Sequence, residues 1–205
     1  MDERSKSKIW FTFDFELAWG VAENGLWRAR QESGVYRKLH ARIDELISLF
    51  TTHEIPVTWA TVGAMVTEPG HWEFDHLPEK AQQYLADFVE RADTESIDGR
   101  ELFHKVAVAG GGHTIACHSY SHVRFNFPGY TEESVAQDLL LARASLKQYG
   151  EHGSCLVLPQ NIECHMNALS LAGVYLCRTT PLDRAGNRYL RKASNTLGYF
   201  PPAKS

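Results

Sequence analysis

Two acidic residues stand two positions apart at the end of an apolar run near the beginning of the chain. The run FTFDFE covers residues 11–16 and places Asp14 and Glu16 on either side of Phe15. Because successive side chains of a strand point to opposite faces, both carboxylates belong to one face, and Phe13 and Phe15 to the other. Two carboxylates at short range cannot both ionise comfortably inside a protein without a cation. The pair therefore indicates either a solvated loop mouth or a metal site.

Two histidines are the candidate partners of this acidic pair. His118 and His122 stand four residues apart in GHTIACHSYSH, residues 112–122. One helical turn would bring both imidazoles onto one face, and imidazole with carboxylate suits zinc or a similar divalent ion. The spacing alone is a weak signal in a chain with ten histidines. Both pairs nevertheless follow predicted strands, whose carboxyl ends meet at one edge of a parallel sheet.

The elements that must position these side chains alternate along the sequence. Short apolar segments predict strands at residues 9–15, 55–63, from 114 onwards, 155–159 and 174–178. Helical periodicity or capping residues predict helices at 36–50, 79–91, 101–109 and 131–147, the last capped by Thr131, and a short helix that ends at Gly173. Strands separated by helices imply right-handed crossovers and a largely parallel sheet. The tail after Thr179 shows little periodicity and receives no element.

Length and composition predict one ordinary globular domain. The 205 residues fit a single domain at 1–205, in which the polar segment at about 67–97 reads as an insertion. The formal charge of −4 and the lack of a basic block argue against nucleic acid as a partner. No apolar stretch predicts an export signal or a membrane span, so the expected location is cytoplasmic. The four cysteines lack the short spacing of zinc sites, and we expect reduced, buried thiols.

Five segments carry a resemblance to a known family. In order along the chain they are TFDFE (12–16), IPVTWATVG (55–63), GHTIACHSYSH (112–122), YTEESVAQDLLLARASLKQYG (130–150) and VLPQN (157–161). Over about residues 8–178 the chain resembles the polysaccharide deacetylases of the carbohydrate esterase 4 type. The resemblance implies an α/β fold, a distorted (β/α) barrel with fewer strands than a closed eight-stranded one, and leaves open that this barrel is incomplete at the C-terminus.

The resemblance also implies a reaction and the residues that perform it. The expected activity is metal-dependent hydrolysis of an N-acetyl group on a sugar, either a glycan precursor or a polysaccharide. Asp14 matches the catalytic base, and His118 and His122 match the histidine ligands of a divalent metal, expected to be zinc. Phe15 stands where most members have a metal-binding aspartate, so the chain is more similar to members with an acid-x-acid motif. Glu16 returns to the face of Asp14 and becomes the expected third ligand.

Two departures from the family pattern leave other functions open. The arginine that orients the base is missing from VLPQN, where Val157 or Gln160 occupies its region. The late histidine that protonates the leaving amine is also missing, since no histidine follows His165. A catalytically silent carbohydrate-binding homologue, or a hydrolase of another non-peptide C–N bond, therefore remains an alternative. The oligomeric state is not predicted.

Some further residues invite a functional interpretation that the sequence does not settle. His113 is expected to be structural, while Trp19 fits the pocket lining and the core equally well. The cluster of His71, Trp72, Asp75 and His76 in the insertion fits either a sugar-stacking surface or a solvated loop. Ser119 and Ser121 lack a G-x-S-x-G elbow, which argues against a serine hydrolase.

Overall fold

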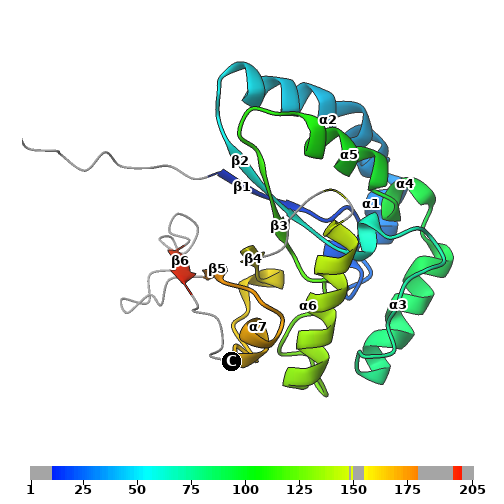
Figure 1. Cartoon of the computed structure of the whole chain (residues 1–205). Coiled ribbons are helices and arrows are strands. Elements are labelled where there is room, and N and C mark those ends of the chain that lie inside the picture. Colours follow the sequence, from blue (N-terminus) through cyan, green and yellow to red (C-terminus); the bar gives the residue numbers. More distant parts are fainter. Residues whose placement is uncertain (1–10, 148, 150–154, 180–195, 200–205) are drawn as a thin grey trace, which may run out of the picture.

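A curled sheet of six strands organises the protein. The computed structural model describes residues 11–147, 149, 155–179 and 196–199. In sheet order the strands are β1 (Phe11–Phe15), β2 (Val57–Thr61), β3 (Thr114–Cys117), β4 (Cys155–Val157), β5 (Leu176–Thr179) and β6 (Thr196–Tyr199). The first five run parallel, and β6 pairs antiparallel with β5. Together the five parallel strands form a half-barrel, with helices packed around it (Figure 1).

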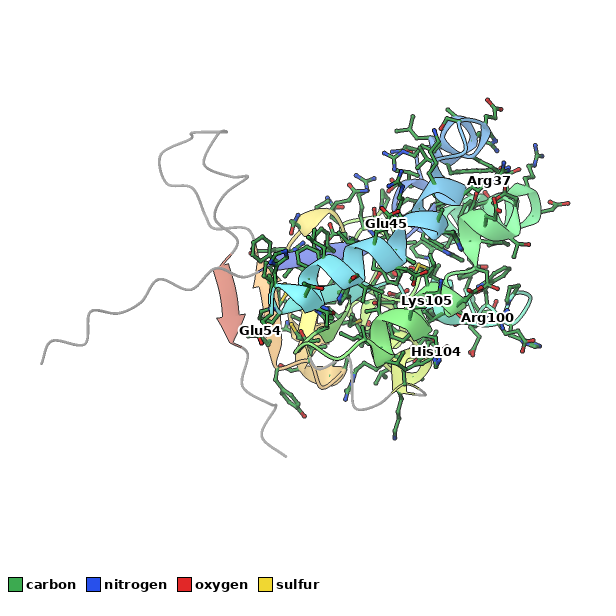
Figure 2. All side chains as sticks on the ribbon, turned by 90° about the horizontal axis from the view of Figure 1, so that it is seen from above. Arg37, Glu45, Glu54, Arg100, His104 and Lys105 are labelled. Carbon is green, nitrogen blue, oxygen red and sulfur yellow. The ribbon has the colours of Figure 1, made fainter. Side chains whose placement is uncertain are left out.

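The helices follow the strands in the order expected of parallel crossovers. The α-helices are α1 (Trp27–Glu32), α2 (Val35–Thr52), α3 (Glu79–Arg91), α4 (Thr94–Ile97), α5 (Arg100–Val108), α6 (Glu132–Lys147) and α7 (Asn167–Leu171). Short 3-10 helices cover Trp19–Val21, Ala64–Val66 and Pro159–Asn161. Figure 2 shows α2 and α5 lying side by side, and Lys105 Nζ on α5 lies 2.9 Å from Asp44 Oδ2 on α2.

Aromatic side chains hold β1 and β2 against α2. The ring of Phe13 lies 5.5 Å from the ring of Phe50 on α2 and 5.5 Å from that of Trp59 on β2. Phe15 meets the edge of Trp59 and is buried. The predicted alternation of side chains in β1 is therefore confirmed for Phe13 and Phe15, which pack on the main core. Thr12 and Asp14 take the inner face of the half-barrel.

The inner face of the half-barrel differs from the outer one in size and polarity. Ala60, Ala116 and Val157, from three neighbouring strands, form a small apolar cluster separate from the main core. Thr58 and Thr114, on β2 and β3, hydrogen-bond to each other beside it, with their hydroxyl oxygens 2.9 Å apart. Small and polar side chains thus line the inner face, whereas aromatic and aliphatic side chains cover the outer face.

Most of the predicted elements are confirmed. The helix at 79–91 matches α3, that at 36–50 lies within α2, and five strands occupy the five predicted segments. Thr131 caps α6 as expected, because its hydroxyl oxygen accepts the Ser134 N–H at 3.2 Å. The predicted segment at 67–97 contains a second helix, α4, which has only four residues and too little length to show periodicity. Residues 9 and 10 of the predicted first strand lie outside the described residues.

Three broader expectations can be compared with this fold. The half-barrel agrees with an α/β class and with a partial (β/α) barrel. No helix in the described part of the chain is both long and apolar enough to cross a bilayer. All four cysteines are free thiols, but only Cys117 and Cys177 are buried, while Cys155 and Cys164 are partly exposed. Burial raises the pKa of the Cys117 thiol to about 12.

Candidate metal centre

Glu16 takes its place at a sharp turn where β1 ends. Leu17 has a left-handed backbone (φ 45°), and the Trp19 N–H donates to the Glu16 carbonyl at 2.9 Å. The turn places the Glu16 carboxylate directly over Gly20. A Cβ built on Gly20 would lie 1.9 Å from Glu16 Oε1, far inside contact distance. The glutamate therefore occupies this position because residue 20 carries no side chain.

His118 follows β3 directly and is oriented by the neighbouring strand. Its Nδ1 lies 2.7 Å from the carbonyl oxygen of Val157 on β4, and the residue is 1 % exposed. Because a carbonyl oxygen only accepts, Nδ1 carries a hydrogen, and Nε2 is the nitrogen that faces Glu16 and could bind a metal. A backbone carbonyl that fixes the imidazole tautomer in this way is common behind metal-bound histidines.

The segment from His118 to His122 is not a helical turn, so that expectation was wrong. Ser119 (φ 62°) and His122 (φ 59°) both have left-handed backbones. The amides within the segment donate to side chains instead of to carbonyls one turn earlier: the His122 N–H bonds Ser119 Oγ at 3.0 Å, and the Tyr120 N–H bonds an Asp138 carboxylate oxygen at 2.8 Å. A tight bend, not a helix, brings the two imidazoles together.

Glu16, His118 and His122 converge on one point. His122 Nε2 lies 2.9 Å from Glu16 Oε2 and 3.2 Å from His118 Nε2, and His118 Nε2 lies 3.3 Å from Glu16 Oε2. Tetrahedral ligands about 2.05 Å from zinc are separated by about 3.3 Å, which follows from typical Zn–N and Zn–O lengths. The three observed separations, 2.9–3.3 Å, therefore match three corners of a zinc tetrahedron. The residues fit a divalent metal with one position left open.

The surroundings favour the charged form of the glutamate. Burial by itself would raise the pKa of Glu16, but hydrogen bonds and charge interactions with His118 and His122 outweigh burial and place it well below its usual range. Both histidines are buried, whereas the Glu16 side chain is 25 % exposed. One side of the centre thus remains open to solvent, as a site for water and substrate requires.

Asp14, near the end of β1, is held by an arginine from another strand. Arg178 Nη2, from β5, lies 3.2 Å from Asp14 Oδ1, and Nη1 of the same guanidinium donates to Thr12 Oγ1. Nη2 also lies 3.4 Å from Asn161 Oδ1. The Asp14 side chain is 43 % exposed, while that of Arg178 is 7 % exposed. A buried cation therefore fixes a carboxylate that solvent can still reach.

The contact between Arg178 and Asp14 depends on the curl of the sheet. β2, β3 and β4 separate β1 from β5. In a flat sheet the two strands would lie about 19 Å apart, four spacings of about 4.8 Å, which exceeds the reach of an arginine. Curling turns the inner faces of β1 and β5 towards each other. Arg178 spans the remaining opening of the half-barrel.

Arg178 is the functional candidate that the sequence analysis missed. The family pattern places the orienting arginine in VLPQN, but the side chain of Val157 belongs to the small apolar cluster and Gln160 is exposed. Arg178 is the single charged residue in the apolar stretch VYLCR, and this was the available signal. Its hydrogen bond to Asp14 connects residues that are 164 positions apart in the sequence, and no local pattern reveals such a contact.

Two of the open residues prove to be structural. Trp19 is 1 % exposed, and its Nε1 donates to the Ile97 carbonyl at 2.9 Å, so it belongs to the core. His113 lies at the amino end of β3, where its Nδ1 accepts the Val57 N–H at 3.3 Å. Burial lowers the pKa of His113, which favours this neutral, bridging role.

The structure does not place all four residues of the cluster His71, Trp72, Asp75 and His76 in a solvated loop, and it does not leave Trp72 exposed as a sugar-stacking surface would require. Trp72 packs against Trp19, and its Nε1 donates to the Ala64 carbonyl at 2.9 Å. The side chain of His76 is 9 % exposed and faces Asp138. His71 and Asp75 match the solvated interpretation: both residues are exposed, and 72 % of the His71 side chain is open to solvent.

Replacing Gly20 with alanine is expected to weaken metal binding by about tenfold or more, a loss typical of disturbing the groups that orient a ligand. The new methyl group would displace the carboxylate of Glu16, which can swing aside because it ends a flexible side chain. Competition titration with a chromophoric chelator measures the affinity. Gly70→Ala is a control for the added methyl group, since a Cβ there meets nothing within 4 Å, although its φ of 91° adds a backbone strain that Gly20 does not have. Equal zinc affinity in Gly20→Ala and the wild type would show that Glu16 is not a ligand.

Comparison of the chain with models of protein families, with curated proteins and with solved structures yields no match in any of the three.

Proposed function

We propose that the protein is a metal-dependent hydrolase that removes an N-acetyl group from a sugar, either a glycan precursor or a polysaccharide. The observation that carries the proposal is the convergence of Glu16, His118 and His122 near the carboxyl ends of β1 and β3. The similarity of the five sequence segments to polysaccharide deacetylases supports the choice of substrate. The polar inner face and the exposed carboxylate of Asp14 agree with a hydrolytic site.

Each residue of the centre has a defined task in such a reaction. Glu16, His118 and His122 would hold a divalent ion, for which zinc suits the donor set. When bound, this ion supplies a Lewis acid that polarises the acetyl carbonyl and acidifies water. Asp14 accepts the proton of the attacking water as general base. Arg178 and Thr12 keep the Asp14 side chain in one orientation, and the Val157 carbonyl keeps His118 in the ligating tautomer.

Arg178 also bears on the departure of the chain from the family pattern. The resemblance places the orienting arginine in VLPQN, where this sequence has none. Arg178 reaches the same carboxylate from β5, the next strand in the sheet. We propose that it substitutes for the missing arginine, which weakens the argument for a catalytically silent homologue.

Acetate release tests the proposed function. The purified chain, stripped with a chelator and reloaded with zinc or cobalt, would be incubated with N-acetylglucosamine, its β-1,4-linked oligomers and its nucleotide-linked form. We expect acetate with metal and none after stripping. Sugar binding without acetate would identify a silent binding protein, and release from formyl or cyclic amide substrates alone would identify a hydrolase of another C–N bond. Either result would overturn the deacetylase assignment.

A further inference from the structure

A carboxylate lies fully buried behind the segment that carries the two histidines. Asp138 on α6 is 0 % exposed. One of its oxygens accepts the Tyr120 N–H at 2.8 Å, and the other accepts the Ser121 N–H at 3.2 Å. These two amides belong to the residues midway between His118 and His122. Asp138 therefore holds the bend that joins the two candidate ligands.

A histidine from the 67–97 segment also contacts this carboxylate. His76 Nε2 lies 3.1 Å from Asp138 Oδ1, the oxygen that also accepts from Ser121. Because a carboxylate only accepts, Nε2 of His76 carries the hydrogen in this contact. Hydrogen bonds to an ionised acceptor are roughly twice as strong as neutral ones. Asp138 thus links the histidine-bearing segment to α6 and, through His76, to the 67–97 segment.

The bend needs such support because its backbone is strained. Ser119 and His122 adopt left-handed conformations that side chains other than glycine seldom take, and such residues persist where the surroundings over-determine them. Besides Asp138, the amides of Gly63 and Ala64 donate to the carbonyls of Ser119 and Tyr120, each at 2.9 Å. Both amides and carbonyls of the bend are therefore held from outside the segment.

The position of Asp138 on its helix argues against a purely stabilising role. The other residues of the buried face of α6 are apolar: Val135, Leu139, Ala142 and Leu146 are each 0 % exposed. A buried carboxylate is costly, and apolar replacements of buried charges are often as stable or more stable. A carboxylate at this place has the specific effect of fixing where His122 points.

We propose that Asp138, supported by His76, is the positioning residue of the metal centre: it sets the bend of residues 119–121 so that His122 Nε2 meets Glu16 and His118. This inference rests on the proposed metal centre. It adds that zinc affinity depends on a carboxylate that touches no ligand side chain and lies on an element remote from β1.

The test compares metal binding with stability in Asp138→Asn. Asparagine keeps the shape but presents an N–H₂ group to one of the donors, so at least one backbone amide of the bend loses its acceptor. We expect the affinity for Co²⁺ or Zn²⁺ to fall by at least about tenfold, as for other groups behind metal ligands. The visible spectrum of the cobalt-loaded variant should also change, because His122 is displaced. A purely stabilising role would lower the Tm of the stripped and loaded forms equally and leave affinity and spectrum unchanged.

Two further variants keep the experiment decisive. Asp98→Asn is the matched control, since Asp98 also accepts a backbone amide, that of Arg100 at 3.1 Å, and pairs with its guanidinium away from the bend. It should bind metal like the wild type. If Asp138→Asn fails to fold, His76→Leu removes one contact and should weaken affinity by a few fold. Unchanged affinity in the folded variants would overturn the inference while the metal centre stands, whereas a wild type that binds no metal would overturn both.

Discussion

Asp14→Asn is expected to lower kcat for acetate release by about 10²–10⁴-fold, the usual contribution of a general base. Asparagine has nearly the same shape and can still accept a hydrogen bond from Arg178 through its amide oxygen. It cannot take a proton from water, so the step that activates the nucleophile is lost. Initial-rate measurements on the zinc-loaded wild type and variant determine the ratio of their kcat values.

The same variant separates catalysis from metal binding. Asp14 contributes no atom to the cluster of Glu16, His118 and His122, so zinc content and affinity should match those of the wild type. Glu23→Gln is a suitable control, because Glu23 is also a partly buried carboxylate paired with an arginine, Arg124, but it lies outside the cluster. Full activity in Asp14→Asn would remove Asp14 from the mechanism, and loss of zinc would assign it to the metal site.

Arg178→Met is expected to reduce kcat by about 10²-fold, the loss that a misplacement of about 1 Å can cause. The variant keeps the length and apolar volume of the side chain but removes the donors to Thr12, Asp14 and Asn161. Asp14 would then rotate freely on the inner face of the half-barrel. The kcat of Arg178→Lys should lie between those of the wild type and Arg178→Met. Lysine keeps the positive charge, but its ammonium group cannot reproduce the fork of guanidinium donors. Steady-state kinetics would show the loss in kcat, with little change in KM.

A structural role for Arg178 would give a different result. Arg143→Met is the control, since the partly buried Arg143 donates to the Ala172 carbonyl away from Asp14. If both arginine variants lose activity in proportion to their loss in Tm, Arg178 acts through stability. A fall in kcat confined to Arg178 at equal zinc content supports its role as the positioning residue of Asp14.

Local sequence patterns were sufficient to predict most of the helices and strands. The aromatic and β-branched residues of β1 and β2 and the apolar stripe of α2 each lie within one segment, so propensity and periodicity reveal them. The four-residue α4 and the six-residue α1 carry too few turns for a stripe to emerge. The largely parallel direction of the strands followed from the alternation of strands and helices, because parallel strands need crossovers.

The three candidate metal ligands were predictable from the sequence, but the geometry of the site and the role of Arg178 were not. Glu16, His118 and His122 could be selected because carboxyl ends of parallel strands share one edge. The bend at His118–His122 was taken for a helical turn, because the groups that hold it, the Asp138 carboxylate among them, come from other segments of the chain. Arg178 escaped for the same reason: its contact with Asp14 follows from the curl of the whole sheet, which no single segment encodes.

X-ray absorption at the zinc edge of the loaded protein tests the central claim most directly. We expect one zinc per chain with a first shell of light atoms only: two imidazole nitrogens at about 2.0–2.1 Å, and oxygens from Glu16 and water at about 2.0–2.2 Å. The His118→Ala/His122→Ala double variant should lose the imidazole signal and the stoichiometric metal together. Sulfur scattering at about 2.3 Å, which cysteine ligands produce, or an unchanged spectrum in the double variant, would contradict the account.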